Sequence, residues 1–206
     1  MRLVFRSLSG RVLLALWVVL PTVPSARAFD LEQLSQQLRE PAVIRGEFVQ
    51  QKQLRALPQP LVSRGQFVLA REQGLLWFLQ EPLQQDYRIT DAGIHQRTFS
   101  GWETAGQQGA AGHQNRLFLA VLRGDAEALQ RDFELELTGT AEAWSLTLLP
   151  RSKLLEQIFS AIMIQGSATA ERVELLETQG DSTVLLLEST AVDDQLSPVE
   201  QHDFTH

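Results

Sequence analysis

Regular alternation of apolar residues in residues 65–89 constrains the fold of this chain more than any other feature. The segment runs Gly-Gln-Phe-Val-Leu-Ala-Arg-Glu-Gln-Gly-Leu-Leu-Trp-Phe-Leu-Gln-Glu-Pro-Leu-Gln-Gln-Asp-Tyr-Arg-Ile, which predicts three short strands joined by turns. Successive side chains of a strand point to opposite faces, so each strand offers one apolar pair to the same side. These pairs predict a continuous apolar wall built from Phe67 with Leu69, Trp77 with Leu79, and Tyr87 with Ile89.

A long cation, Arg71, stands in the turn between the first two of these strands. A guanidinium carries five N–H donors and keeps its charge in proteins, so it can hold several acceptors at the rim of an apolar wall. The alternative is an ordinary turn arginine that is solvated and has no special role.

The rest of the chain repeats the alternating pattern, with about ten short strands and few helices. This pattern predicts a mostly β domain with an antiparallel sheet, and a sheet of that size tends to curl or close. The alternation fits either an apolar ligand cavity or a filled core. The side chains that we expect to line such a cavity are Phe48, Phe67, Leu69, Trp77, Leu79, Tyr87, Ile89, Leu135, Trp144 and Leu146.

Several segments favour helices, among them a short one at 126–130 and a single turn within 150–157. Asp30 and Gln33 form a capping-box pattern that starts a helix, which ends near Pro41. Residues 115–123 are apolar nearly all round and follow a glycine-rich stretch, 101–112, which we expect to be the least structured part. They fit a lid or a permanently buried core helix, whose apolar members would be Leu117, Phe118, Val121 and Leu122. The acidic tail, 193–206, has a short helical signal after Pro198.

The N-terminus has the form of a secretory signal peptide, residues 1–28. Three arginines precede an apolar run at 12–20, and Ala26-Arg27-Ala28 supplies the small residues of a cleavage site. The run is too short for a spanning helix, which needs roughly 20 residues. We therefore expect export across the inner membrane, and one domain formed by residues 29–206.

Charge and composition exclude several functions. The net charge is −7, and residues 1–28 contain four arginines and no acid, so residues 29–206 carry −11. This balance argues against nucleic acid and against steady docking on anionic lipid, leaving transient proximity to membranes. The absence of cysteine excludes thiol catalysis and a lipid-modified N-terminal cysteine. Scattered histidines and the lack of nucleophile or phosphate-loop motifs predict no metal, no cofactor and no enzymatic activity, and nothing indicates more than a monomer.

Several motifs in order resemble the LolA-type outer-membrane lipoprotein carriers of the bacterial periplasm. They are Gly46-Glu47-Phe48-Val49-Gln50-Gln51-Lys52, residues 65–71, the Trp77 strand with Glu81-Pro82, Ile89-Thr90-Asp91-Ala92-Gly93, and the strand 144–150. The resemblance covers essentially all of residues 29–206. It implies a strongly curved, incomplete antiparallel β-barrel with a helical lid over an apolar cavity.

The resemblance also implies a function. The cargo would be an acylated lipoprotein or another lipid, accepted from an inner-membrane transporter and passed to an outer-membrane acceptor. Arg71 matches the family's arginine that latches the lid through backbone carbonyls, and we expect those carbonyls at the end of residues 115–123. The chain departs from the family after Arg71, where it has Glu72-Gln73-Gly74-Leu75 in place of proline and an aromatic residue. The departure indicates a paralogous branch whose cargo is a lipoprotein, or a free or glycerol-linked lipid.

Two other functions fit the same pattern. A periplasmic protein of this fold can act as a sensor of lipids or mislocalised lipoproteins that binds an anti-sigma factor. A module with a filled core would serve protein interaction alone. A measured cavity volume distinguishes such a module from a carrier.

Overall fold

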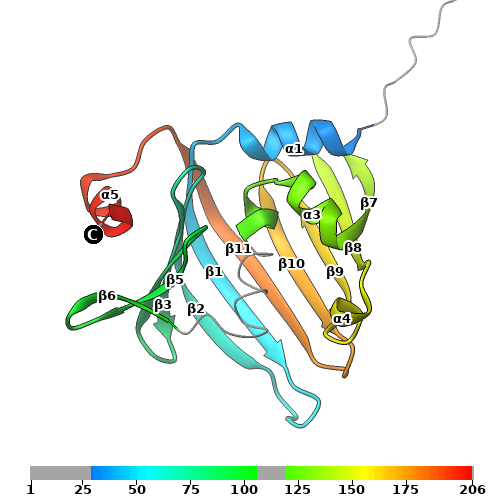
Figure 1. Ribbon diagram of the computed structural model, residues 1–206, viewed down its shortest axis with the longest axis horizontal. Helices are drawn as coiled ribbons and strands as arrows, with labels where there is room; N and C mark the ends of the chain where they lie inside the picture. The colour runs from blue at the N-terminus through cyan, green and yellow to red at the C-terminus, as the bar shows by residue number, and fades with distance from the viewer. Residues whose placement is uncertain (1–28, 106–118, 206) are drawn as a thin grey trace, which may run out of the picture.

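A computed structural model describes residues 29–105 and 119–205, and its centre is one antiparallel sheet of eleven strands (Figure 1). The strand order is β6-β5-β4-β3-β2-β1-β11-β10-β9-β8-β7, so β1 and β11 join two meanders. The strands are β1 (Val43–Gln53), β2 (Leu61–Ala70), β3 (Gly74–Glu81), β4 (Gln85–Thr90), β5 (Gly93–Thr98), β6 (Gly101–Thr104), β7 (Phe133–Thr140), β8 (Ala143–Pro150), β9 (Phe159–Gly166), β10 (Ala170–Glu177) and β11 (Ser182–Asp193).

The mostly β class with few helices is confirmed. The sheet is open, since β6 and β7 are its two edges and the described part of the chain pairs neither edge with the other. One expectation was wrong: residues 101–104, assigned to the unstructured glycine-rich stretch, form β6 and pair with β5. The glycine signal hid this strand because Gly101 occupies its first position at φ 114°, where a turn ends.

Helix α1 (Leu31–Arg39) forms for the local reasons that the sequence gives. The Asp30 carboxylate accepts the Gln33 N–H at 2.9 Å, and the Gln33 side chain accepts the Asp30 N–H at 3.0 Å. This capping box is confirmed, and it satisfies two donors that the first turn leaves unpaired. Leu34 and Leu38, one turn apart, are buried against the sheet.

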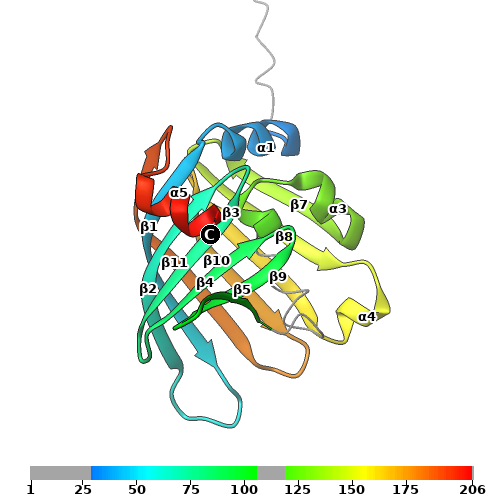
Figure 2. The ribbon, with the colours of Figure 1, turned by 60° about the vertical axis from the view of Figure 1, so that its left-hand side comes forward.

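Helices cover both faces of the sheet, but unequally (Figures 1 and 2). Helix α1, the helical residues 119–122 and α3 (Ala126–Asp132) lie over one face, which carries the larger apolar cluster. The C-terminal helix α5 (Pro198–Thr205) lies on the other face. Helix α4 (Lys153–Glu156) is a single turn between β8 and β9. Residues 1–28, the expected signal peptide, lie outside the described residues. None of the described helices has the length and apolar character needed to cross a membrane.

Candidate functional site: the apolar sheet face and its helical cover

The predicted apolar wall exists and extends across nearly the whole sheet. Nine of its ten expected residues belong to the large cluster or pack against it; Tyr87 on β4 lies outside it and is partly exposed. The buried members are Phe48, Phe67, Leu69, Ile89, Trp144 and Leu146, and the partly buried ones are Trp77, Leu79 and Leu135. Aromatic stacking strengthens the centre, where the Phe48 and Trp77 rings lie 3.6 Å apart.

Residues 119–124 and α3 form a helical cover over this wall, which we call the cover. Helix α1 lies beside it on the same face. Val121 and Leu122, expected on the lid, are buried in the same cluster as the wall, and so is Leu119. The other two expected lid residues, Leu117 and Phe118, lie outside the described residues. A short polar link joins the cover to α1, because the Ser35 hydroxyl donates to the Gly124 carbonyl at 2.7 Å.

Side chains of α1, the cover and the sheet pack closely where the helices meet β8 and β9. The apolar pocket between α1, the cover and strands β8 and β9 holds about 20 Å³. That is close to the room for one water molecule, whereas pockets for small ligands measure about 300–1,000 Å³. At this place the wall is therefore filled, and an acyl chain could lie there only if the helices moved.

Arg71 holds backbone carbonyls at the C-terminal end of α1. Its Nη2 donates to the Pro41 carbonyl at 2.7 Å and to the Leu38 carbonyl at 3.2 Å. Carbonyls at this end of a helix have no intrahelical partner, so a guanidinium suits them. In residues 119–123, the described part of the segment expected to meet Arg71, no carbonyl accepts from it; the helix that Arg71 contacts is α1. Burial, aided by the nearby charge of Arg39, lowers the pKa of Arg71, which still leaves it a cation at neutral pH.

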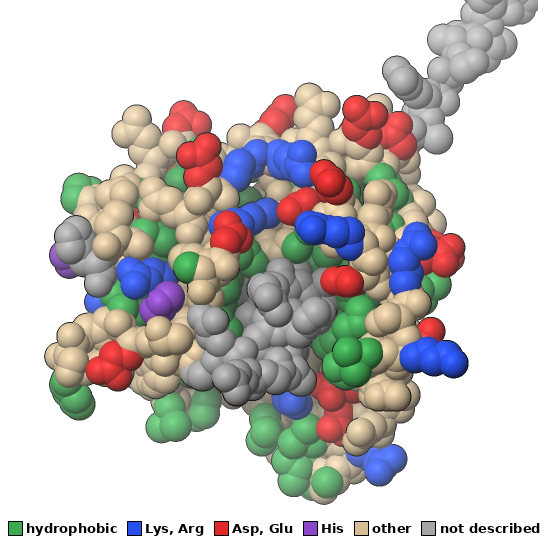
Figure 3. Space-filling view, viewed as in Figure 1, with side chains coloured by type: hydrophobic (Ala, Val, Ile, Leu, Met, Phe, Trp, Pro, Cys, Tyr) green, Lys and Arg blue, Asp and Glu red, His purple; other side chains and the backbone are tan. Residues whose placement is uncertain are grey.

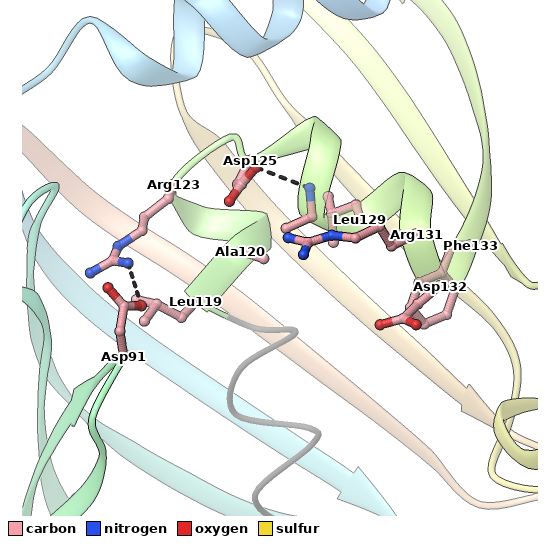
Figure 4. Close-up of a pocket in the computed structure, with 10 residues that line it drawn as sticks. Asp91, Leu119, Ala120, Arg123, Asp125, Leu129, Arg131, Asp132 and Phe133 are labelled. Atoms are coloured by element: carbon pink, nitrogen blue, oxygen red, sulfur yellow. Dashed lines mark hydrogen bonds and ion pairs between the residues drawn. The ribbon is translucent and has the colours of Figure 1, made fainter.

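A second arginine, Arg123, joins the cover to the β4–β5 turn (Figure 4). Its Nη1 contacts the Asp91 carboxylate at 2.8 Å, while its buried Nε and Nη2 have no hydrogen-bond partner. The two residues border an open groove of about 560 Å³ that continues along α3. Sequence reasoning missed this contact, although Asp91 lies in the Ile89–Gly93 motif and Arg123 ends the predicted lid helix.

The C-terminal helix α5 is fastened to the other sheet face by arginines. Arg45 binds the Glu200 carboxylate with two hydrogen bonds, of 2.6 and 2.7 Å, and these hold the pKa of Glu200 down at about 2. Arg88 donates to the carbonyls of Asp203 and Phe204, and Arg97 pairs with the Asp203 carboxylate at 2.7 Å. Sequence reasoning treated this tail as an acidic end of the chain. The signal for its attachment was present in the sequence: Arg45, Arg88 and Arg97 all lie on the strand face that points away from the wall.

Metal chemistry finds no support in the described residues. Within 29–105 and 119–205 there is no group of three or more histidine and carboxylate side chains placed to hold an ion. Of the four histidines, His113 and His206 lie outside those ranges. The arrangement can cover and uncover an apolar surface, because arginines and other side-chain hydrogen bonds hold short helices over it.

Comparison with solved structures gives the fold. The crystal structure of MucB matches with 15% identity and a TM-score of 0.50, covering 82% of this chain and 60% of that one. The complex of Pseudomonas aeruginosa MucA/MucB matches at 16% identity and 0.48, covering 82% of this chain and 58% of that one. This chain thus spans about three fifths of those proteins. A LolA superfamily protein from Nitrosomonas europaea matches at 9% identity and 0.48, covering 87% and 99%.

Sequence comparison gives the family. No curated protein sequence matches the chain. The family model described as outer membrane lipoprotein carrier protein LolA-like matches residues 23–200, which is most of the sequence. The order of motifs from the Phe48 strand to the Trp144 strand and the open antiparallel sheet under short helices agree with that match. The chain therefore belongs to the LolA-like outer membrane lipoprotein carrier family.

Proposed function

We propose that this protein is a periplasmic carrier that shields the acyl chains of a lipoprotein or another lipid between its apolar sheet face and its helical cover. Residues 1–28 would direct export and be removed, leaving 29–206 as one carrier domain. By family resemblance, cargo would come from an inner-membrane transporter and leave to an outer-membrane acceptor. Sheet and helices would then work as an incomplete, curved barrel with a helical lid.

The observation that carries this proposal is the apolar wall under helices that are held by side-chain contacts and not by a strand ladder. The wall forms one apolar cluster from Ile89 on β4 to Leu146 on β8, with members on every strand between them. The polar links between cover, α1 and sheet come from side chains. They include Ser35 to the Gly124 carbonyl, Arg39 to Asp125, Gln37 to the carbonyls of Ala141 and Ser167, Arg71 to the end of α1, and Arg123 to Asp91. Loosening these links would free a large apolar surface without breaking a strand ladder.

Cargo exchange can then be a near-balanced swap. Each buried methylene is worth about 0.8 kcal/mol, so a chain of roughly fifteen carbons gains about 12 kcal/mol on leaving water. Cargo would replace the apolar side chains of the cover on the wall, and its ester or amide carbonyls would accept from Arg71 in place of the α1 carbonyls. Such a carrier binds its cargo loosely enough to deliver it.

Native mass spectrometry tests the proposal on protein exported and purified from its own periplasm without detergent. We expect a co-purifying acylated peptide, phospholipid or fatty acid, and uptake of a fluorescent fatty acid by the apo protein. Leu135→Gln, on the wall, should weaken uptake, while Glu134→Gln, its exposed neighbour on the opposite face of β7, should not. A clean apo mass with no fatty-acid uptake would contradict the carrier.

One observation favours a second function, a protein-interaction module of the same fold with a filled core. The apolar pocket of about 20 Å³ is what a permanently filled core would have. In that case the helices would not move, and a partner protein would bind the outside of the cover. Native mass spectrometry and fatty-acid uptake distinguish this module from the carrier. Only the interaction module would show an apo mass together with no uptake.

A further inference from the structure

Exposed apolar side chains gather at one end of the sheet. Eight large hydrophobic residues among those the structure describes are exposed, and six of them lie at the end where β1 finishes and β2 begins. Strand pairing brings five connections to this end, which we call the tip end: β1–β2, β3–β4, β5–β6, β8–β9 and β10–β11. The six residues are Leu57, Leu61, Val62, Leu83, Phe99 and Leu154.

The most exposed of these side chains come from different connections. Leu83 is 74% exposed in the β3–β4 turn, Leu154 is 71% exposed on α4, and Phe99 is fully exposed in the β5–β6 turn. Single exposed apolar residues are normal on a protein surface. Phe99 and Leu83 at the apices of short turns are unusual, since neither residue type helps to form a turn. Figure 3 shows several groups of hydrophobic side chains along the lower edge of the molecule, with a few charged ones among them, and more charged side chains along the upper edge.

Charge distinguishes the tip end from the rest of the chain. Residues 29–206 carry −11, yet the tip-end connections hold more cations than acids: Arg55, Arg151 and Lys153 against Glu156 and Asp181. The connections at the opposite end hold Glu40, Glu72, Asp91, Glu142 and Asp194 against Arg71. Next to the tips, Lys52 and Arg64 are neutralised by ion pairs with Glu177 and Glu81. The acidic character of the chain is thus kept away from the tip end.

The tips are also held in place. The Asp181 carboxylate accepts the backbone N–H of Arg55 at 2.8 Å, which ties the β10–β11 turn to the β1–β2 connection. In that connection the Gln53 amide donates to the carbonyls of Leu54 and Leu57 at 3.2 and 3.0 Å. Hydrogen bonds therefore fix the turn that carries Leu57, and the fold itself keeps this side chain exposed.

From this geometry we propose that the tip end docks on a lipid bilayer surface, with Leu83, Phe99 and Leu154 inserted among the headgroups. A protein groove receives a contiguous patch, whereas single side chains on four separate connections suit a plane that each can enter by itself. The slight positive balance avoids repulsion from anionic lipid, and the few cations make the binding brief and largely independent of salt. The docking does not depend on cargo. It can therefore be correct or wrong independently of the proposed carrier function.

Vesicle flotation tests the docking with residues 29–206 and vesicles of phosphatidylethanolamine containing a minor share of phosphatidylglycerol. We expect weak binding that persists at high salt. The variant carrying Leu83→Gln, Phe99→Gln and Leu154→Gln should bind at least about tenfold more weakly, since burying even one such side chain is worth about that factor. The matched control carries Val192→Gln and Val199→Gln, which are 58% and 70% exposed away from the tip end, and should bind as the wild type does.

A dye at the docking end gives a second readout that does not depend on the triple variant folding. The chain has no cysteine, so Ser100→Cys next to Phe99 can carry a polarity-sensitive fluorophore at one position. Its emission should shift to the blue on addition of vesicles, and that of a label at Ser197→Cys, on the opposite end, should not.

Four results would overturn the proposal: no shift at position 100, equal shifts at both positions, equal loss of binding in the control variant, or binding that vanishes at high salt. Self-association of the wild type that the triple variant abolishes would also overturn it, by making a second copy of this chain the occupant.

Discussion

At the level of single residues, Arg71 holds the end of α1 through the carbonyls of Leu38 and Pro41. Hydrogen bonds from a charged donor contribute about 1.5–3 kcal/mol, and removal leaves two helix-end carbonyls without this partner. We expect Arg71→Leu to keep the fold, to lower the free energy of unfolding by about 1–3 kcal/mol in urea denaturation, and to block cargo uptake or release.

The control for this substitution is Arg64→Leu on β2, the strand that leads into the Arg71 turn. Arg64 is exposed and lies 3.8 Å from the exposed Glu81 carboxylate, so its loss should change stability by less than about 0.5 kcal/mol. Normal cargo transfer by the Arg71→Leu protein would refute the latch, whatever its stability.

Glu200 makes the attachment of α5 sensitive to acid. Its hydrogen bonds with Arg45 lower the pKa from 4.5 to about 2, even though burial acts in the opposite direction. A carboxyl group that is more acidic in the folded state stabilises that state above the unfolded pKa and ceases to do so as pH falls through the folded one. The contribution, about 2–3 kcal/mol, should therefore be complete above pH 4.5 and disappear as the pH falls from there to about 2.

Urea denaturation across that pH range measures the effect. The difference in unfolding free energy between the wild type and Glu200→Gln should be largest above pH 4.5 and shrink toward pH 2. A difference that stays constant with pH would mean that the carboxylate charge does not fasten α5.

At the level of elements, the contact between the cover and α1 depends on Gly124. The residue has φ +64°, and a Cβ there would lie 2.6 Å from the Cβ of Leu38. Gly124→Ala should therefore destabilise the protein by about 2–3 kcal/mol, since strain in the backbone adds to overlap with α1. Calorimetric unfolding measures the change.

Gly180→Ala is the matched control, because Gly180 has a similar left-handed backbone at φ +91° and its Cβ would meet only Arg55 Cδ at 3.6 Å. It should cost about 1 kcal/mol, the backbone strain alone. Equal effects of the two substitutions would show that the cover does not rest on α1 at this point.

The elements also show which sequence signals are dependable. The capping box of α1 and the strands of residues 65–89 form as predicted because their signals are local. Strand β6 was missed because its sequence, Gly-Trp-Glu-Thr, has no strand pattern of its own. It forms an edge strand only because it pairs with β5. Arg71 was recognised as a residue that holds carbonyls, but the helix that it contacts was wrong, since the choice of partner depends on the path of the chain in space.

At the level of the whole molecule, the sheet and its cover should differ in stability. Strands β1, β2 and β11 lie at the centre of the sheet, each paired on both sides, whereas α1 and the helical residues of the cover meet the rest through side chains and a few polar links. Hydrogen exchange should therefore be slowest in the central strands and much faster in residues 119–132.

Cargo adds a second expectation for the same measurement. If the cover moves, exchange in residues 119–132 and α1 should rise further when a fatty acid is bound, with the central strands unchanged. Cover amides as slow as those of β1, with or without fatty acid, would indicate a permanently buried core.

The sequence by itself determined the strands, the α1 cap and the apolar wall, because alternation, capping and turn chemistry act over a few residues. Only the tertiary structure decided that the sheet stays open, that α1 is the helix held by Arg71, and that Arg123 meets Asp91. It also decided that the tail packs against β1, β4 and β5 through Arg45, Arg88 and Arg97. These contacts join residues far apart in the chain. Which of them meet depends on how the strands pair and how the helices pack on the sheet, and no local sequence preference specifies that.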